Sequence, residues 1–338
     1  MDLNTVWFIL IAVLFCGFFF LEGFDYGVGL LLPFLSKADR DRRAVINSIG
    51  PFWDGNEVWM ITAGAALLTA FPGVYASLTS GFYLVVIFMI MGLIIRAVGF
   101  EFRSKGEGSR WRSLWDWALF LGSLVPAFFW GLIIANLMRG IALEENFYHY
   151  GGLAPLLNPY ALFGALVFVG LFSLHGASFL GIKLVSPLKE RAKAAARLLW
   201  PPVMLLAALF LVWTYLATDL LHNPGLDGLP LAVIAALALG AYGIFLRRDR
   251  EMLTFVSGGI AVLSLVVMVF AGLYPNLMIS TLDPAFSLTV YNSAASPAVL
   301  RWMSIVMLIF LPLVMLYQGW TYWIFRQRVG PDTPDLHY

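Results

Sequence analysis

The chain has 338 residues, of which 61% are hydrophobic and 12% are charged, and its formal net charge is +1. A soluble domain normally carries about 25% charged residues, so a water-exposed surface of ordinary polarity could not cover this chain. Its basic residues form short clusters between long apolar runs, which argues against a nucleic-acid-binding surface. The composition therefore predicts an integral membrane protein that has the lipid bilayer as its main solvent.

Nine stretches are long and apolar enough to cross a bilayer core of about 30 Å as helices. The apolar runs, bounded by charges, Gly and Pro, place these predicted helices at 7–35, 52–71, 76–102, 112–138, 158–184, 197–218, 229–246, 252–273 and 297–325. The runs lack the period-2 alternation of membrane strands, so we expect an all-α polytopic fold in a single integral membrane domain over 1–338. The first stretch lacks the preceding basic residues of a signal peptide and is expected to be retained.

An internal similarity predicts how these helices are grouped. Residues 17–23 read Gly-Phe-Phe-Phe-Leu-Glu-Gly, and residues 170–176 read Gly-Leu-Phe-Ser-Leu-His-Gly at a constant offset of 153. A parallel repeat would relate the four helices of 7–138 to the four helices of 158–273. We therefore expect two four-helix bundles plus a peripheral ninth helix at 297–325, which a short cytoplasmic tail follows. The alternative is chance similarity between two apolar segments rich in Gly and Phe.

The basic residues predict the orientation in the membrane. Of the 21 Lys and Arg residues, 18 lie in the C-terminal tail or around the connections after the first, third, fifth and seventh predicted helices: Lys37, Arg40, Arg42, Arg43, Arg103, Lys105, Arg110, Arg112, Lys183, Lys189, Arg191, Lys193, Arg197, Arg247, Arg248, Arg250, Arg326 and Arg328. The positive-inside rule assigns these segments to the cytoplasm. The N-terminus is then outside and the C-terminus is cytoplasmic, which agrees with an odd number of helices.

Four carboxylates lie within the first two predicted helices. Glu22 and Asp25 are three residues apart, share a helix face and lie about midway along the first helix. Asp54 and Glu57 repeat this spacing at the inner end of the second helix. An ionisable group inside a membrane costs several kcal/mol and is by default a candidate functional group. Because carboxylates in a low dielectric can bind and release protons near neutral pH, these four residues predict a proton pathway from the cytoplasm.

Three further charges are predicted to support this group. Arg96 and Glu101 belong to the third predicted helix, and Asp116 lies near the inner end of the fourth. A structural interpretation stays open, in which Arg96 neutralises one or two carboxylates and Asp54 caps the second helix just after Pro51. Capping or interfacial solvation explains Asp54 and Asp116 as well as proton transfer does. Glu22 and Asp25 lie too deep for this explanation, which favours a functional or partner-contacting role.

The histidines argue against a metal or haem site in this chain. His175 is the one histidine inside a predicted helix, and the others fall in the outer loops or the tail: His149, His222 and His337. A pair of axial imidazoles cannot be built, and the single cysteine, Cys16, excludes a multi-thiolate site. His175 occupies the repeat position of Glu22 and is interpreted as a hydrogen-bonded packing residue. We therefore expect no metal ligand in this chain.

Three segments resemble the signature segments of a known family. Residues 21–30 read Leu-Glu-Gly-Phe-Asp-Tyr-Gly-Val-Gly-Leu, residues 50–59 read Gly-Pro-Phe-Trp-Asp-Gly-Asn-Glu-Val-Trp, and residues 96–103 read Arg-Ala-Val-Gly-Phe-Glu-Phe-Arg. Together with the length, helix number and orientation, these segments resemble subunit II of cytochrome bd quinol oxidase over essentially the whole chain. Charged residues in such contexts are rare in other membrane families, so the resemblance is specific.

The resemblance implies an oxidoreductase of the bacterial cytoplasmic membrane that oxidises quinol and reduces oxygen to water. It also implies that a partner, subunit I, holds two b-type haems, one d-type haem and the quinol site. This chain is then expected to pack against subunit I without haem and without catalytic residues of its own. Whether a small single-helix accessory subunit also binds stays open from the sequence. The positions that match a proposed proton pathway of the family are Asp25, Asp54 and Glu57. Subunit I has its own proposed pathway, so the resemblance does not decide which route dominates.

Two other functions remain open from the sequence. A proton-coupled secondary transporter would also combine repeats with buried carboxylates, although this sequence lacks the paired, Gly- or Pro-interrupted helices typical of such proteins. A purely structural partner subunit would use its apolar helices only to cover subunit I. Identifying what co-purifies with the chain, together with a reduced-minus-oxidised haem spectrum, would separate these functions.

Overall fold

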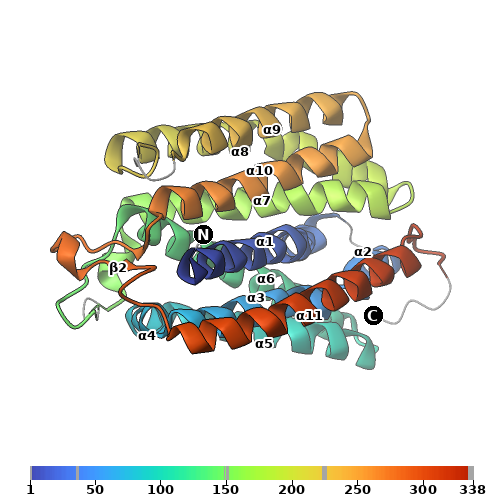
Figure 1. The fold of residues 1–338 in the computed structure, drawn as a ribbon. Helices are drawn as coiled ribbons and strands as arrows, with labels where there is room; N and C mark the ends of the chain where they lie inside the picture. The colour runs from blue at the N-terminus through green and yellow to red at the C-terminus, as the bar shows by residue number, and fades with distance from the viewer. Residues whose placement is uncertain (1, 36–37, 148, 150–151, 223–226, 334–338) are drawn as a thin grey trace.

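The computed structural model describes residues 2–35, 38–147, 149, 152–222 and 227–333. Long helices that run roughly parallel or antiparallel to one another make up most of this part of the chain (Figure 1). The helices are α1 (Leu3–Leu35), α2 (Asp39–Ile49), α3 (Trp53–Ala70), α4 (Pro72–Gly81), α5 (Tyr83–Phe102), α6 (Ser109–Arg139), α7 (Pro159–Lys183), α8 (Leu188–Ala217), α9 (Leu229–Arg247), α10 (Glu251–Leu273) and α11 (Pro297–Ile324). The all-α fold class is confirmed.

Short elements connect the long helices at both ends of the bundle. The single-turn helices are η1 (Arg103–Lys105), η2 (Ala154–Leu157) and η3 (Pro284–Phe286). A small antiparallel ladder joins β1 (Asn276–Met278) to β2 (Leu288–Thr289) in the connection before α11. The Asn158 side chain caps α7 by accepting a hydrogen bond from the Ala161 N–H group. These caps and turns satisfy backbone groups where the chain leaves the helices.

Eight helices among the described residues are long and apolar enough to cross a membrane. They correspond to all the predicted spans except the one expected at 52–71. That segment forms α3, an 18-residue helix whose polar first turns lower its mean hydropathy. In Figure 1, α3 nevertheless runs alongside the long helices, from α2 at one end of the bundle to α4 at the other. The chain is therefore a multi-pass membrane protein.

The structure differs from the predicted helices in three places. The helix expected at 76–102 is two helices, α4 and α5, because the chain bends at Phe82, whose N–H group donates to the Leu78 and Ser80 carbonyls. The α2 helix was not predicted because it has only 11 residues and a largely polar sequence. The α8 helix begins at Leu188, well before the predicted position 197, because its first turns are charged and hydropathy marks only the apolar part of a helix.

The α1 helix lies at the centre of the bundle and contacts α3, α6, α7 and α10. In Figure 1, α7 to α10 lie on one side of α1, and α3 to α5 with α11 lie on the other. The close crossing of α1 and α7 requires glycine: a Cβ at Gly27 would lie 1.9 Å from the Phe172 carbonyl oxygen and 2.8 Å from the Gly176 Cα. A Cβ at Gly122 of α6 would likewise lie 2.7 Å from the Arg96 Cβ of α5. Gly122 thus lets α6 pack closely against α5 at the position of Arg96.

The α11 helix is peripheral, as predicted for the last helix. Leu300 is the buried residue of this helix, and most of its other side chains are exposed. Figure 1 shows that α1 begins at one end of the bundle and that α11 ends at the opposite end, which fits an odd number of crossings. The parallel repeat of 7–138 and 158–273 stays a prediction.

Candidate functional site

A buried arginine joins three helices in the interior of the chain. Arg96 of α5 is fully buried, and its Nη1 donates to Glu22 Oε1 of α1 and, at 2.8 Å, to Glu57 Oε1 of α3. Its guanidinium also lies over the aromatic rings of Tyr26 and Phe100, with its Cζ 5.0 and 5.5 Å from the ring centroids. Ion pairs and cation–π contacts therefore hold the positive charge in place from α1, α3 and α5.

Asp25 lies one turn beyond Glu22 and is linked to a different helix. Its carboxylate is fully buried, and Asn56 Nδ2 of α3 donates to Asp25 Oδ2 at 2.7 Å. The Asn56 Oδ1 atom accepts hydrogen bonds from Gln318 Nε2 at 2.7 Å and from the Tyr322 hydroxyl at 2.9 Å, both on α11. Asp25 is therefore connected through Asn56 to the peripheral helix. We name Glu22, Asp25, Glu57 and Arg96 the Arg96 cluster.

The carboxylates near the start of α3 become less exposed with distance from the end of the helix. Asp54 lies in the first turn and its side chain is exposed, whereas the Glu57 side chain, one turn further in, is 16% exposed. Asp25 and Glu22 are fully buried. The residue that precedes α3 is Phe52, which makes no side-chain cap, so Asp54 does not cap this helix as the structural interpretation supposed. The acids thus form a series from solvent to interior.

The Arg96 cluster contains more negative groups than positive ones. One guanidinium pairs with Glu22 and Glu57, the third carboxylate, Asp25, is bonded to Asn56, and Glu22 Oε2 and Asp25 Oδ1 have no hydrogen-bond partner among the described residues. Full ionisation would leave two uncompensated charges in a low dielectric, where each would cost several kcal/mol. Neutrality instead requires protons on these carboxylates. The cluster can therefore store and exchange protons.

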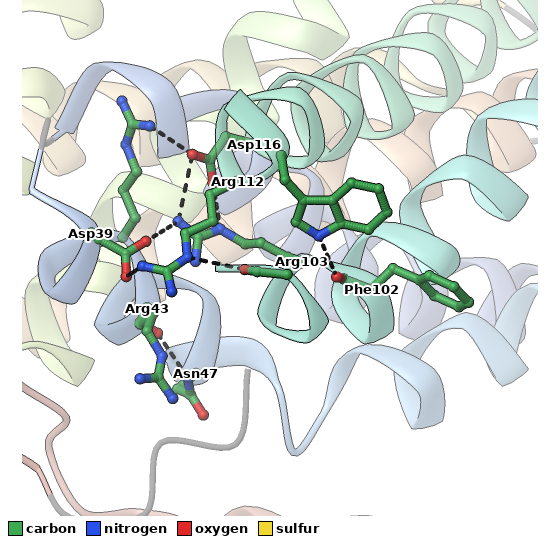
Figure 2. A network of polar contacts seen from close by, with 10 residues as sticks. Asp39, Arg43, Asn47, Phe102, Arg103, Arg112 and Asp116 are labelled. Carbon is green, nitrogen blue, oxygen red and sulfur yellow. Dashed lines mark hydrogen bonds and ion pairs between the residues drawn. The ribbon is translucent and has the colours of Figure 1, made fainter. Parts of the chain in front are cut away.

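A second group of charges lies near the end of the bundle where α2, η1 and α6 meet (Figure 2). Asp116 of α6 is buried; its Oδ1 accepts from Arg103 Nε, and its Oδ2 accepts from Arg42 Nη1, both at 2.6 Å. Asp39 Oδ1 accepts from Arg103 Nη2 at 3.0 Å, and Asp39 Oδ2 accepts from Arg112 Nη1 at 2.8 Å. We name these five residues the Arg103 cluster. Its contacts tie α2 to the α5–α6 connection.

The structure thus divides the predicted site residues into three sets. Glu22 and Glu57 pair with Arg96, and Asp25 lies one turn from Glu22 and is bonded to Asn56, whereas Asp54 lies at the exposed end of the same helix as Glu57. Asp116 is a buried charge, but it belongs to the Arg103 cluster. Glu101 differs from the prediction, because its side chain is exposed at the end of α5. It lies between the buried Phe100 and the exposed Phe102, on a face of the helix that turns away from the core.

Sequence reasoning missed three polar residues that complete the surroundings of Asp25. Asn56 lies inside the segment 50–59, but an amide carries no charge and did not stand out. Gln318 and Tyr322 are four residues apart on α11 and therefore share a face. This i, i+4 polar pair in an otherwise apolar helix was the signal that could have identified them.

His175 has the contacts of a packing residue. It is fully buried, its Nε2 lies 3.0 Å from the Phe20 carbonyl oxygen, and its ring stacks on Phe255 with centroids 4.8 Å apart. Its Nδ1 lies 3.5 Å from where a Cβ on Gly258 would be, so this side also faces a neighbouring helix. Within the described ranges, no group of three or more His, Cys, Asp or Glu residues could hold a metal ion. Two residues singled out from the sequence, Lys37 and His337, lie outside those ranges.

Comparison with known proteins identifies the family. The family model described as cytochrome bd terminal oxidase subunit II matches residues 3–325. The chain belongs to this family. It is 37% identical over 333 residues to cytochrome bd ubiquinol oxidase subunit 2 of Bacillus subtilis (strain 168), with 98% of each chain covered. It is 34% identical over 363 residues to cytochrome bd-I ubiquinol oxidase subunit 2 of Escherichia coli (strain K12), with 98% of this chain and 96% of that protein covered.

A solved structure has the same fold. The structure of bd oxidase from Geobacillus thermodenitrificans contains a chain that matches with a TM-score of 0.75 at 19% identity, covering 96% of this chain and 99% of that chain. The family membership makes this protein a subunit of an oxidoreductase complex, a terminal oxidase of the respiratory chain. Membership in the subunit II family also implies a subunit I as partner.

Proposed function

We propose that this chain is the haem-free second subunit of a cytochrome bd-type oxidase and that it conducts protons from the cytoplasm through Asp54, Glu57, Glu22 and Asp25. In this proposal the partner, subunit I, holds two haems b, the haem d and the quinol site, and this chain also stabilises it. The complex couples quinol oxidation to the reduction of oxygen to water. The observation that carries the proposal is the excess of buried carboxylates over positive charge in the Arg96 cluster.

The exposure of the acids supports a direction for the protons. Water reaches Asp54 and part of Glu57, while Glu22 and Asp25 are fully buried. Glu57 and Glu22 share the same Arg96 Nη1 atom, which keeps their carboxylates close together. A proton that arrives from solvent can therefore pass from an exposed carboxylate to a partly buried one and then to the interior.

The distribution of charge supports a cytoplasmic entrance. Asp54 lies at the start of α3, at the same end of the bundle as α2 and as the Arg103 cluster (Figures 1 and 2). Most of the basic residues belong to connections at this end, so the positive-inside rule assigns it to the cytoplasm. The N-terminus is then outside and the C-terminus is cytoplasmic.

The contacts of His175 support the absence of haem in this chain. Its Nε2 faces the Phe20 carbonyl and its Nδ1 lies 3.5 Å from where a Cβ on Gly258 would be, so both ring nitrogens face neighbouring helices and leave no room for a porphyrin. No step of the proposed proton transfer therefore involves a cofactor bound to this chain. The exposed apolar face of α11 supports the stabilising role, since a partner helix or lipid must cover side chains such as Trp302 and Leu316.

The test replaces Asp25 with Asn in the assembled oxidase. Asp25→Asn keeps the shape of the side chain but cannot release a proton, so we expect quinol-driven oxygen consumption and proton uptake to fall at least about tenfold. The reduced-minus-oxidised haem spectrum should stay unchanged. Asp283→Asn is the matched control, because Asp283 is exposed in the connection before α11.

Three outcomes would decide against parts of the proposal. Full turnover in an assembled Asp25→Asn oxidase would remove this residue from the proton path and leave a structural role. Subunit I that keeps all its haem when it is produced without this chain would contradict the stabilising role. A haem spectrum from the purified chain alone would contradict the haem-free assignment.

A further inference from the structure

We infer that Gln318 and Tyr322 of α11 are positioning residues for Asp25, which they orient through the amide of Asn56. The inference rests on the proposed function, since it concerns how the proton-binding carboxylate is held. It begins with a chain of three hydrogen bonds that crosses from the peripheral helix to α1. Gln318 and Tyr322 donate to Asn56 Oδ1, and Asn56 Nδ2 donates to Asp25 Oδ2.

The two donors fix which way the Asn56 amide faces. Asn56 is fully buried, so water cannot replace a missing partner of its amide. If the amide were flipped, its NH₂ group would face the Gln318 NH₂ group, and its carbonyl oxygen would face the Asp25 carboxylate. Both contacts would be repulsive, or would each require another group to turn. Gln318 and Tyr322 together therefore keep the Asn56 NH₂ group directed at Asp25.

The packing of α11 indicates that these two residues are placed for this contact. They are four residues apart and half-buried, on a helix whose buried residue is Leu300. The Tyr322 ring stacks on Phe52 with centroids 4.3 Å apart and an interplanar angle of 4°, which holds the hydroxyl in place. Gly55 of α3 faces Gln318: a Cβ there would lie 3.8 Å from Gln318 Oε1.

The arrangement specifies which oxygen of Asp25 exchanges the proton. Asn56 occupies Oδ2, and Oδ1 has no hydrogen-bond partner within the described part of the chain. The proton is therefore held and released at Oδ1, while Oδ2 stays bound to the amide. Without the donors on α11, the Asn56 amide could turn, and the carboxylate would lose this fixed orientation.

The experiment uses single and double substitutions in the assembled oxidase. Gln318→Met and Tyr322→Phe each leave one donor on Asn56 Oδ1, so each should slow turnover by less than about twofold. The double variant leaves no donor on Asn56 Oδ1. It should slow turnover by about tenfold, which is more than the product of the two single effects. The KM for quinol should not change. Tyr317→Phe and Thr321→Val are matched controls on the same helix, because Tyr317 is exposed and the Thr321 hydroxyl donates to the Tyr317 carbonyl.

An infrared measurement separates positioning from simple support of the fold. The C=O band of protonated Asp25, assigned as the band that Asp25→Asn removes, should move to higher wavenumber when the Asn56 bond is weakened. It should move partly in each single variant and further in the double variant, because hydrogen bonds in a chain polarise one another. A residue that only supports packing would lower the yield of the complex without moving this band.

The outcomes distinguish this inference from the proposed function. If Asp25→Asn slows turnover while the double variant keeps the wild-type rate and band, the inference is wrong and the proton path stands. If Asp25→Asn itself has full turnover, the proposed proton path through Asp25 is wrong. Should the double variant fail to assemble, the band in the two single variants decides, and an unmoved band overturns the inference.

Discussion

The chain contains two groups of paired charges that differ in their ratio of arginine to carboxylate. The Arg103 cluster has three arginines for two carboxylates, and all four oxygens of those carboxylates accept hydrogen bonds from arginines. The Arg96 cluster has one arginine for three carboxylates, and two of its oxygens accept none among the described residues. Saturated ion pairs hold helices together, whereas unsaturated carboxylates are free to bind protons. The ratio of charges and the number of satisfied oxygens thus distinguish the Arg103 cluster from the Arg96 cluster, for which we propose a role in proton transfer.

The largest expected effect tests the structural side of this comparison. Asp116→Asn leaves Arg42 and Arg103 without their shared counter-ion, so the free energy of unfolding should fall by about 3–5 kcal/mol. Thermal unfolding of the solubilised complex measures this loss, and turnover per assembled complex should not change. Glu101→Gln is the matched control, because Glu101 is exposed and a surface substitution changes stability by about 0.5 kcal/mol or less. If Asp116→Asn were as stable as the wild type, the Arg103 cluster would not be structural and the comparison between the two clusters would fail.

The next largest effect tests the proposed role of the Arg96 cluster in proton transfer. Glu22→Gln resembles the protonated acid but cannot release a proton, so oxygen consumption should fall by about 10²-fold. The loss of stability should be smaller than for Asp116→Asn, because Arg96 keeps its ion pair with Glu57. Turnover and thermal unfolding are measured on the same preparations. A stability loss with full turnover would mean that the Arg96 cluster is structural too.

A smaller effect sharpens the series from solvent to interior. Glu57→Gln should reduce turnover less than Glu22→Gln does, and Asp54→Asn should reduce it by no more than about threefold, because water reaches Asp54 and can deliver protons beyond it. The rate of oxygen consumption should therefore be lower in a variant whose substituted residue is more deeply buried. An Asp54 variant slower than the Glu22 variant would contradict this order.

The smallest effect concerns an ion pair outside both clusters, between the exposed Asp249 and the buried Lys193. The hydrogen bond and charge of Lys193, 2.5 Å away, hold the pKa of the exposed Asp249 below its ordinary value of 3.8. This pair therefore contributes stability above about pH 3.8 and loses it as the pH falls further. The thermal midpoint should drop slightly more in wild type than in Asp249→Asn between about pH 5 and about pH 3. Equal drops would show that Asp249 contributes nothing.

The fold could be predicted to a large extent because lipid imposes strong constraints on a sequence. Eight of the nine expected spans correspond to helices that could cross a membrane, and α3 occupies the ninth. The errors have a common cause: hydropathy detects apolar length but not backbone bends or polar helices. It therefore missed α2, the break at Phe82 and the charged first turns of α8.

The candidate site could be predicted in part, through its charges. Glu22, Asp25 and Arg96 stood out because charge is costly within an apolar helix. Their uncharged neighbours Asn56 and Gln318 did not, since single amides are common in membrane helices and cost less. Glu101 was predicted to be buried, but the exposed face of a helix end cannot be recognised when hydropathy is the only signal.

The sequence by itself determined the membrane class, the helical fold and the residues that carry charge, because these follow from local composition and from the cost of placing polar groups in lipid. Only the tertiary structure decided which charges meet. Glu22 and Arg96 are 74 positions apart, as are Arg42 and Asp116, yet one pair belongs to the Arg96 cluster and the other to the Arg103 cluster. That difference depends on how close small residues such as Gly122 let the helices pack, and on which helix faces then point inward.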